Sequence, residues 1–142
     1  MILETTNISL DKNDLIKDLV GKPFGIFRRI KSKGLYSKRL NIDQVSPNFN
    51  GYINNLDENN ANLELRPFGV IVKIHKGLKK YSWVIPFNNL ELHIKNGISI
   101  HSNGKFIHFK NNKTLKQNKS FFDKLLNQKV KCEFQNKSNL LF

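Results

Sequence analysis

The sequence contains a single cysteine, Cys132, and no apolar run close to the ~18 residues that a membrane-spanning helix needs. One cysteine excludes an internal disulfide framework, so nothing favours an oxidising compartment. The first residues, Met1–Glu4, include an acid where a secretory signal is basic, and no long apolar core follows them. These absences predict a soluble, cytoplasmic protein.

Motifs for catalysis and cofactor binding are also absent. The sequence has no glycine-rich phosphate loop, no CxxC pair, no HExxH and no GxSxG. The acidic pair Asp57 and Glu58 stands alone in a polar stretch, which favours solvation over acid–base chemistry. We therefore expect no enzymatic activity, no cofactor, no bound metal and no small-molecule substrate.

Acidic residues are scarce where lysines are dense, and this is the strongest functional signal in the sequence. The formal net charge is +13 and the pI is about 10.0. Residues 67–122 hold ten lysines and one acid, Glu91, while residues 22–39 hold seven lysines and arginines and no acid. Residues 41–65 reverse the sign, with four acids and no basic residue. Charge segregated in this way produces a directional positive field that attracts polyanions.

A compositional bias gives a second explanation for part of this charge. The chain has 20 asparagines and 20 lysines but only four arginines, which is what a preference for AAA- and AAT-like codons produces. The lysine excess therefore has a functional and a mutational explanation, and both stay open at the level of the sequence.

The composition fits one folded domain over residues 1–142, because 39% of the residues are apolar and 11% are aromatic. Near the N-terminus, Ser9 or Asp11 can cap a short helix whose apolar stripe ends before Gly21. Ser46 followed by Pro47 is typical of a helix start and predicts a helix over residues 47–56.

The segment between these helices, residues 22–42, is ambiguous. Residues 24–30 alternate like a strand, and a turn at 32–34 would return the chain as a second strand over 35–40.

The most regular part of the sequence is a run of alternating apolar residues between residues 69 and 110. Turns at 77–78, 95–97 and 103–104, each with a glycine, fix the pairing of the strands on either side. All three turns bring apolar residues onto the same inner face, which predicts a five-strand antiparallel meander. The predicted pairs are Ile74 with Tyr81, Val72 with Trp83, Val70 with Ile85, Ile94 with Ile98, Leu92 with Ile100, Ile100 with Ile107, and Ile98 with Phe109.

After a lysine-rich link, Ser120 can cap a helix that carries apolar residues from Phe121 to Leu126. Alternation over residues 130–134 favours a last strand. The predicted fold class is α+β: an antiparallel β-meander with short helices near the N- and C-terminal ends. A partly closed barrel is the alternative arrangement of the sheet.

The outer face of the predicted meander carries an aromatic residue and several histidines. Phe106 is set opposite His101, and beside cations such a ring favours base stacking. The alternative is that Phe106 packs beneath a helix as part of a second core layer. His93, His101 and His108 with Glu91 also allow a metal site or metal-free cleavage of a phosphodiester, but solvated surface histidines are the favoured interpretation.

The first basic block predicts a charged finger. If residues 32–34 form a hairpin tip, the charges on either side project together and can lie along a phosphate backbone or in a groove of structured RNA. A solvated loop is the alternative. Arginine grips phosphate in a bidentate manner, so Arg28, Arg29 and Arg39 matter more than their number suggests.

Over residues 63–130, the predicted meander with its closing amphipathic helix resembles the second half of a pleckstrin-homology-like barrel. The predicted helix at 47–56 departs from that topology. The resemblance implies binding to an anionic lipid headgroup or to a protein partner. The whole chain is also similar to small basic bacterial proteins of unknown activity, and this similarity implies no function.

From these observations we predict non-catalytic binding of structured RNA, with ribosomal or ribosome-associated RNA as the expected partner. An anionic membrane surface or an acidic protein is the alternative partner. Lysines and arginines would engage phosphates, and Tyr36 or Phe106 would stack on a base. The predicted nucleic-acid-binding residues are Arg28, Arg29, Lys31, Lys33, Tyr36, Lys38, Arg39, Lys73, Lys76, Lys79, Lys80, Lys105, Phe106 and Lys110.

Overall fold

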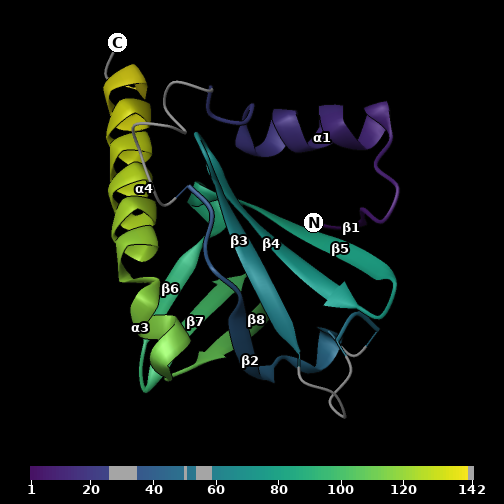
Figure 1. The fold of residues 1–142 in the computed structure, drawn as a ribbon. Helices are drawn as coiled ribbons and strands as arrows, with labels where there is room; N and C mark the ends of the chain where they lie inside the picture. The colour runs from purple at the N-terminus through teal and green to yellow at the C-terminus, as the bar shows by residue number, and fades with distance from the viewer. Residues whose placement is uncertain (26–34, 50, 54–58, 141–142) are drawn as a thin grey trace.

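A computed structural model of the protein describes residues 1–25, 35–49, 51–53 and 59–140, with side chains through residue 135. Figure 1 shows a bent sheet with one helix on each side. The elements in chain order are β1 (Ile2–Glu4), α1 (Leu10–Val20), β2 (Leu40–Val45), η1 (Pro47–Phe49), β3 (Asn60–Arg66), β4 (Gly69–Lys76), β5 (Lys79–Pro86), η2 (Phe87–Asn89), β6 (Glu91–Ile94), β7 (Gly97–Ser102), β8 (Lys105–Lys110), α3 (Lys113–Gln117) and α4 (Lys119–Leu140).

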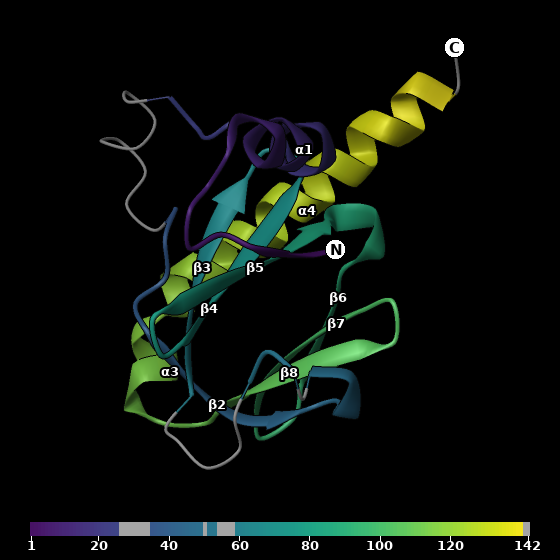
Figure 2. The ribbon, with the colours of Figure 1, turned by 90° about the vertical axis from the view of Figure 1, so that its right-hand side faces the viewer.

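The eight strands form one antiparallel sheet in the order β1-β5-β4-β3-β2-β8-β7-β6. Two groups of hairpin-connected strands, β3–β5 and β6–β8, are joined through β2, which pairs with β3 at Leu40 and with β8 from Ile42 to Val45. The two groups face in different directions in Figure 2 because the sheet bends at β2. The sheet is not closed, since β1 and β6 are its two edges. The α+β prediction is therefore confirmed, with an open sheet.

The predicted pairing within the hairpins is confirmed for every pair, from Ile74 opposite Tyr81 to Ile98 opposite Phe109. The prediction of one continuous five-strand meander is wrong at a single step, because β5 and β6 are not neighbours. After β5 the chain turns through η2, where Phe87 and the following Leu90 are buried. Burial of these two side chains carries the chain across the core to the other group of strands, and β1 pairs with the edge of β5.

The turns have the backbone that the predicted register needs. Gly77 has φ 59°, and Asn103 and Gly104 have φ 49° and 77°, which are the positive values of tight hairpin turns. Gly97, with φ 121°, is constrained twice, because a Cβ atom there would lie 2.3 Å from the carbonyl oxygen of Phe109.

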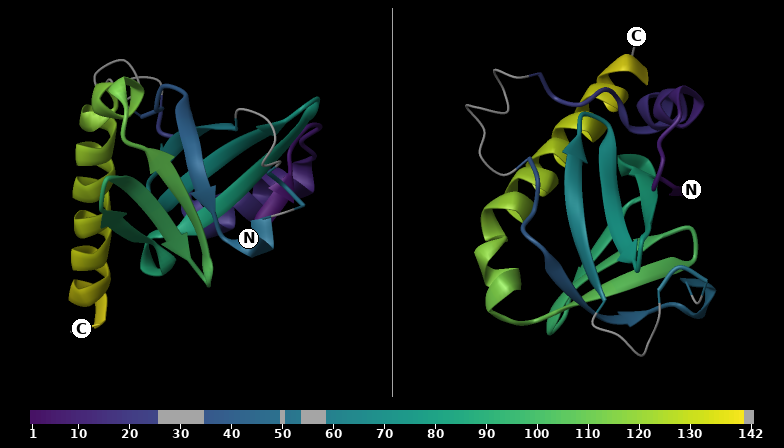
Figure 3. Two further views of the ribbon diagram at one scale, coloured as in Figure 1. Left: turned by 90° about the horizontal axis from the view of Figure 1, so that it is seen from below. Right: turned by 45° about the vertical axis from the view of Figure 1, so that its right-hand side comes forward.

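Most of the apolar core lies on the inner face of the sheet, under α4. Trp83 and Phe109 from the two groups of strands lie in one cluster with Phe121 and Leu125 of α4. Figure 3 shows α4 along the open side of the bent sheet and α1 on its opposite face. Within the described part of the chain, no helix is long and apolar enough to cross a membrane.

The predicted N-terminal helix is confirmed as α1. The side chain of Ser9 caps it by accepting the backbone N–H of Lys12, and Gly21 ends it with φ 89°. Ile16 and Val20 pack on the outer face of β4 and β5 in a second, smaller cluster.

The helix predicted over residues 47–56 is wrong where the structure describes it, because only the short turn η1 forms. Ser46 does not begin a long helix, since its hydroxyl accepts the backbone N–H of Phe106 at 3.0 Å and ties the segment to β8. Phe49 is fully buried, with its ring centroid 5.0 Å from that of Trp83. Residues 54–58 lie outside the described residues.

The strand predicted over residues 130–134 is also wrong, because α4 continues to Leu140. The alternation of Val130, Cys132 and Phe134 fits a helix equally well, since Val130 and Phe134 are four residues apart and lie on one exposed helix face. Between residues 35 and 40 the structure has one bridge, Tyr36 with Glu64, and β2 begins only at Leu40. Strands β1 and β3 were not predicted.

Candidate nucleic-acid interface

Basic side chains gather on the outer face of strands β3–β5, on the side away from α4. The register sets His75 opposite Lys80 across the β4–β5 hairpin, and alternation along β4 places Lys73 on the same face as His75. Two more residues reach this face from the segment before β2. We call this set the outer-face cluster: Tyr36, Arg39, Lys73, His75 and Lys80.

The electrostatics of His75 show how close the cations lie. Burial and the positive charges of Lys80, Arg39 and Lys73 together lower the pKa of the His75 imidazole below its ordinary value of 6.5. Arg39 and Lys80 are 41 positions apart in the sequence, so folding has brought separate basic segments to one place. The result is a local positive potential at the surface.

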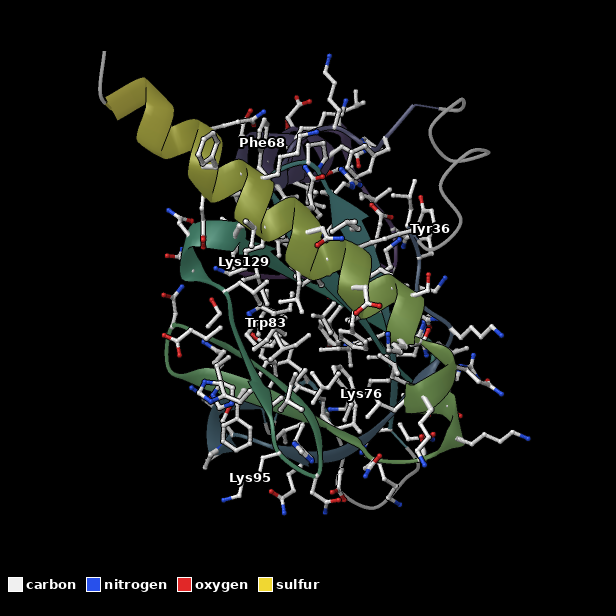
Figure 4. All side chains as sticks on the ribbon, turned by 90° about the vertical axis from the view of Figure 1, so that its left-hand side faces the viewer. Tyr36, Phe68, Lys76, Trp83, Lys95 and Lys129 are labelled. Carbon is white, nitrogen blue, oxygen red and sulfur yellow. The ribbon has the colours of Figure 1, made fainter. Side chains whose placement is uncertain are left out.

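Tyr36 adds an aromatic surface to these charges. Its side chain is 50% exposed, and the Nζ atom of Lys73 lies 5.7 Å from its ring centroid, within the range of a cation–π contact. Figure 4 shows Tyr36 at the right-hand edge of the molecule, far from Lys95 at the β6–β7 turn. An exposed ring next to ammonium groups can stack on a base while the cations hold the neighbouring phosphates.

A buried carboxylate fixes the position of two of the basic side chains. Glu64 is 4% exposed and accepts hydrogen bonds from Lys73, at 2.9 Å, and from Arg66. Arg66 also donates to the carbonyl oxygen of Gly21 at 2.9 Å. Burial alone would raise the pKa of Glu64, but the hydrogen bonds from Arg66 and Lys73 outweigh it and hold that pKa below its ordinary value of 4.5. One negative charge therefore holds Lys73 of the cluster in place and is paired with two positive charges, those of Lys73 and Arg66.

A hollow of about 250 Å³ lies between the cluster and α1. Arg66, Lys73, His75 and Lys80 line one side of it. The α1 side chains that line it, Asn13 and Ile16, are uncharged. The hollow is therefore open to a phosphate or sugar group on its basic side.

Two of the three acids of α1 do not oppose this charge directly. Asp14 and Asp18 line a different hollow, with Lys22 and Phe68. These two carboxylates are therefore turned away from the outer-face cluster.

The other predicted binding residues do not join this group. Lys76 and Lys79 pair at the end of the hairpin, and alternation turns them to the opposite face, where Lys76 donates to the carbonyl oxygen of Gly51. Lys105 and Lys110 lie at the two ends of β8, and the Lys38 side chain is exposed near α3. The remaining four predicted cations lie outside the described residues: Arg28, Arg29, Lys31 and Lys33.

The outer face of β6–β8 carries His93, His101, His108 and Phe106. The structure places Phe106 opposite His101, as predicted. Phe106 stacks on His101, with ring centroids 5.3 Å apart and an interplanar angle of 25°, and the rings of His93 and His101 are 4.2 Å apart. On the same face, the Nδ1 atom of His108 forms a hydrogen bond of 2.6 Å with the hydroxyl of Ser99. Phe106 is half-buried and lies outside the cluster that α1 covers.

These histidines form no metal site. Within the described residues, no group of three or more His, Cys, Asp or Glu side chains could hold a metal ion. His108 is turned toward Ser99 and the carbonyl oxygen of Asn96, which lies 3.1 Å from its Nε2 atom. Burial, followed by the charge of His93, lowers the pKa of His101 below its ordinary value.

Two residues of the cluster's surroundings were missed at the level of the sequence. Glu64 belonged to a segment interpreted only as a reversal of charge, and Arg66 stood alone between the two basic blocks. Recognising β3 as a strand would have found both, because alternation puts them on the face that carries Lys73.

No family model, no curated protein and no solved structure matches this chain.

Proposed function

We propose that this protein binds structured RNA, without catalysing a reaction on it, through the outer-face cluster. The observation that carries the proposal is the convergence of Arg39, Lys73 and Lys80 around His75, beside the exposed ring of Tyr36. The +13 net charge adds long-range attraction for any polyanion. Ribosomal RNA is the first partner to test, because it offers both backbone phosphates and unstacked bases in loops.

The test measures RNA affinity as a function of salt. The wild-type chain and the triple variant Arg39→Glu, Lys73→Glu, Lys80→Glu are titrated with a labelled RNA stem-loop and with purified ribosomal RNA. We expect the wild-type affinity to fall linearly on a log–log plot of salt concentration. The triple variant should bind about 100-fold more weakly, with a salt slope that is shallower by about 3.

A matched control separates the cluster from net charge. The variant Lys110→Glu, Lys113→Glu, Lys116→Glu makes the same change in net charge at three exposed residues that are not part of the cluster. If both variants lose affinity equally, binding follows overall charge and the proposed interface is wrong. Unchanged RNA affinity in the first variant would also overturn it.

The same proteins distinguish RNA from a membrane. Sedimentation with phosphatidylserine vesicles but not with neutral vesicles, combined with weak and cluster-independent RNA binding, would favour the anionic-membrane alternative. Recovery with ribosomes from a low-salt lysate, lost in the cluster variant and kept in the control variant, would support ribosomal RNA as the partner.

A further inference from the structure

Strand β6 leaves one edge of the sheet open next to exposed apolar side chains. Among the described strands, β6 pairs only with β7. Ile94, at its end, is 78% exposed. An open edge presents backbone N–H and C=O groups that can pair with another strand. This edge is therefore one of the two places on the sheet where a further strand can add.

Helix α4 provides an apolar wall beside this edge. Leu126, Val130 and Phe134 follow one another at four-residue spacing and are 39%, 64% and 70% exposed. A hollow of about 470 Å³ lies between this stripe and β6, with Leu92 on the strand side. Figure 4 shows α4, with Lys129, above the β6 side of the sheet and Lys95 at the end of that side. A strand added at β6 would cover this hollow.

The sequence of β6 together with the next residue, Lys95, is complementary to itself in one antiparallel register. With His93 opposite His93 of a second copy, Glu91 of each chain faces Lys95 of the other, and Leu92 faces Ile94. Residues directly opposite on antiparallel strands have Cβ atoms about 5 Å apart, so both charge pairs can form. Glu91 and His93 lie on the outer face of β6, and Leu92 and Ile94 lie on its inner face, with Leu92 next to α4. Lys95 is the first residue of the β6–β7 turn, where its backbone N–H donates to the carbonyl oxygen of Gly97.

Other registers lose this match. A slip of one residue would place the apolar side chains of one strand on the same face of the sheet as the polar side chains of the other. A slip of two residues toward the turn would set His93 opposite Lys95, and a slip in the other direction would set Glu91 opposite His93. Only the register centred on His93 pairs a carboxylate with an ammonium group on both sides of the twofold axis.

We infer that two copies of this chain associate by antiparallel pairing of their β6 strands, with the α4 stripes covering the junction. The interface is isologous, as in most homodimers. Because β6 has only four residues, the buried surface is small and the dimer is reversible. The basic clusters lie on the other group of strands, so RNA binding and dimerisation use different surfaces.

The test is a charge swap followed by sedimentation velocity over a range of protein concentrations. Glu91→Lys places two lysines opposite each other at both ends of the junction, and Lys95→Glu places two glutamates there. Each single variant should weaken dimerisation by about 10-fold or more. The double variant Glu91→Lys, Lys95→Glu restores opposite charges and should recover the wild-type dimer.

Mixing the two single variants gives an independent check. Each chain of the mixture then supplies one sign of charge, so a mixed dimer should form where neither variant dimerises well alone. Val130→Asp should also weaken the dimer, because it puts a charge into the apolar stripe. Circular dichroism of each variant verifies that it is folded.

Three results would overturn the inference. A wild-type chain that remains a monomer at about 1 mM has no such interface. A dimer that is insensitive to both single swaps is built on another surface. A dimer that both single swaps weaken but the double swap does not restore would exclude the register centred on His93.

Discussion

The two groups of strands follow the same rule of alternation but carry different outer faces. On β3–β5, the outer face holds Lys73 and Lys80. The buried Glu64 holds Lys73 in place through a hydrogen bond, and α1 covers the part of this face that carries Ile71 and Val84. On β6–β8, the outer face holds three histidines and Phe106. The ring of His101 contacts the rings of His93 and Phe106, and the histidines hydrogen-bond to Glu91, Ser99 and Asn96. The first surface has cations available for a ligand, whereas the polar groups of the second are largely satisfied within the protein.

The difference shows that charge density along the sequence does not by itself define a binding surface. Strands β4–β8 lie in the lysine-rich segment, whereas β3 lies mostly in the acidic segment that precedes it. Within the described residues, the β3–β5 group receives Tyr36 and Arg39 from a distant part of the chain. A polyanion site arises where long-range folding adds charges of the same sign to a hairpin that already has some.

Equivalent substitutions in the two halves should have very different effects on stability. Glu64→Gln breaks a buried ion network and should lower the free energy of unfolding by about 3 kcal/mol, because Arg66 is left half-paired at 12% side-chain exposure. Glu91→Gln alters an exposed contact with His93 and should cost less than about 0.5 kcal/mol. Urea denaturation at neutral pH measures both.

The pH dependence of stability checks the origin of this effect. The pKa of Glu64 is lower in the folded state than its ordinary 4.5, so the unfolded chain binds more protons once the pH falls below that value. Stability is therefore present above it and is lost as the pH falls through the folded-state pKa. A loss for Glu64→Gln at neutral pH as small as the one expected for Glu91→Gln would show that the Glu64 network is not stabilising.

Removing an aromatic ring from each half should separate stacking from packing. Tyr36→Ala should weaken binding to an RNA with an unpaired loop by about 1–3 kcal/mol, the usual contribution of one stacked base. Phe106→Ala should leave RNA affinity unchanged, because that ring already stacks on His101. Fluorescence titration with the same stem-loop compares them. A larger loss for Phe106→Ala would move the binding surface to β6–β8.

The smallest expected effect is a pH dependence of RNA affinity. Burial, followed by the charges of nearby cations, lowers the pKa of free His75. A bound phosphate would offset the charges of those cations and raise this pKa. The complex then binds more protons than the free protein, so affinity should rise about three-fold from about pH 7.5 to about pH 5.5. His75→Gln should remove this rise and His101→Gln should keep it. If the RNA affinity of the wild-type protein does not change with pH, a bound phosphate does not lie close to His75.

The structure confirms the pairing of strands within the hairpins. The hairpin registers follow from glycine-containing turns and from alternation over six to eight residues. The stacking of Phe106 on His101 follows from the same register. The errors lie where short patterns are ambiguous: residues 130–134 fit a strand or a helix, and Ser46 with Pro47 fits a helix start or a short turn.

The sequence by itself determined the local pairing of strands and an excess of positive charge, because turn geometry and side-chain periodicity act within a few residues. Only the tertiary structure decided that β5 and β6 separate, that β2 joins the two groups, and that Arg39 and Tyr36 reach the face of Lys73. These arrangements depend on burying Phe87, Leu90 and the apolar side of α4 in one core. Such burial joins residues that no local pattern connects.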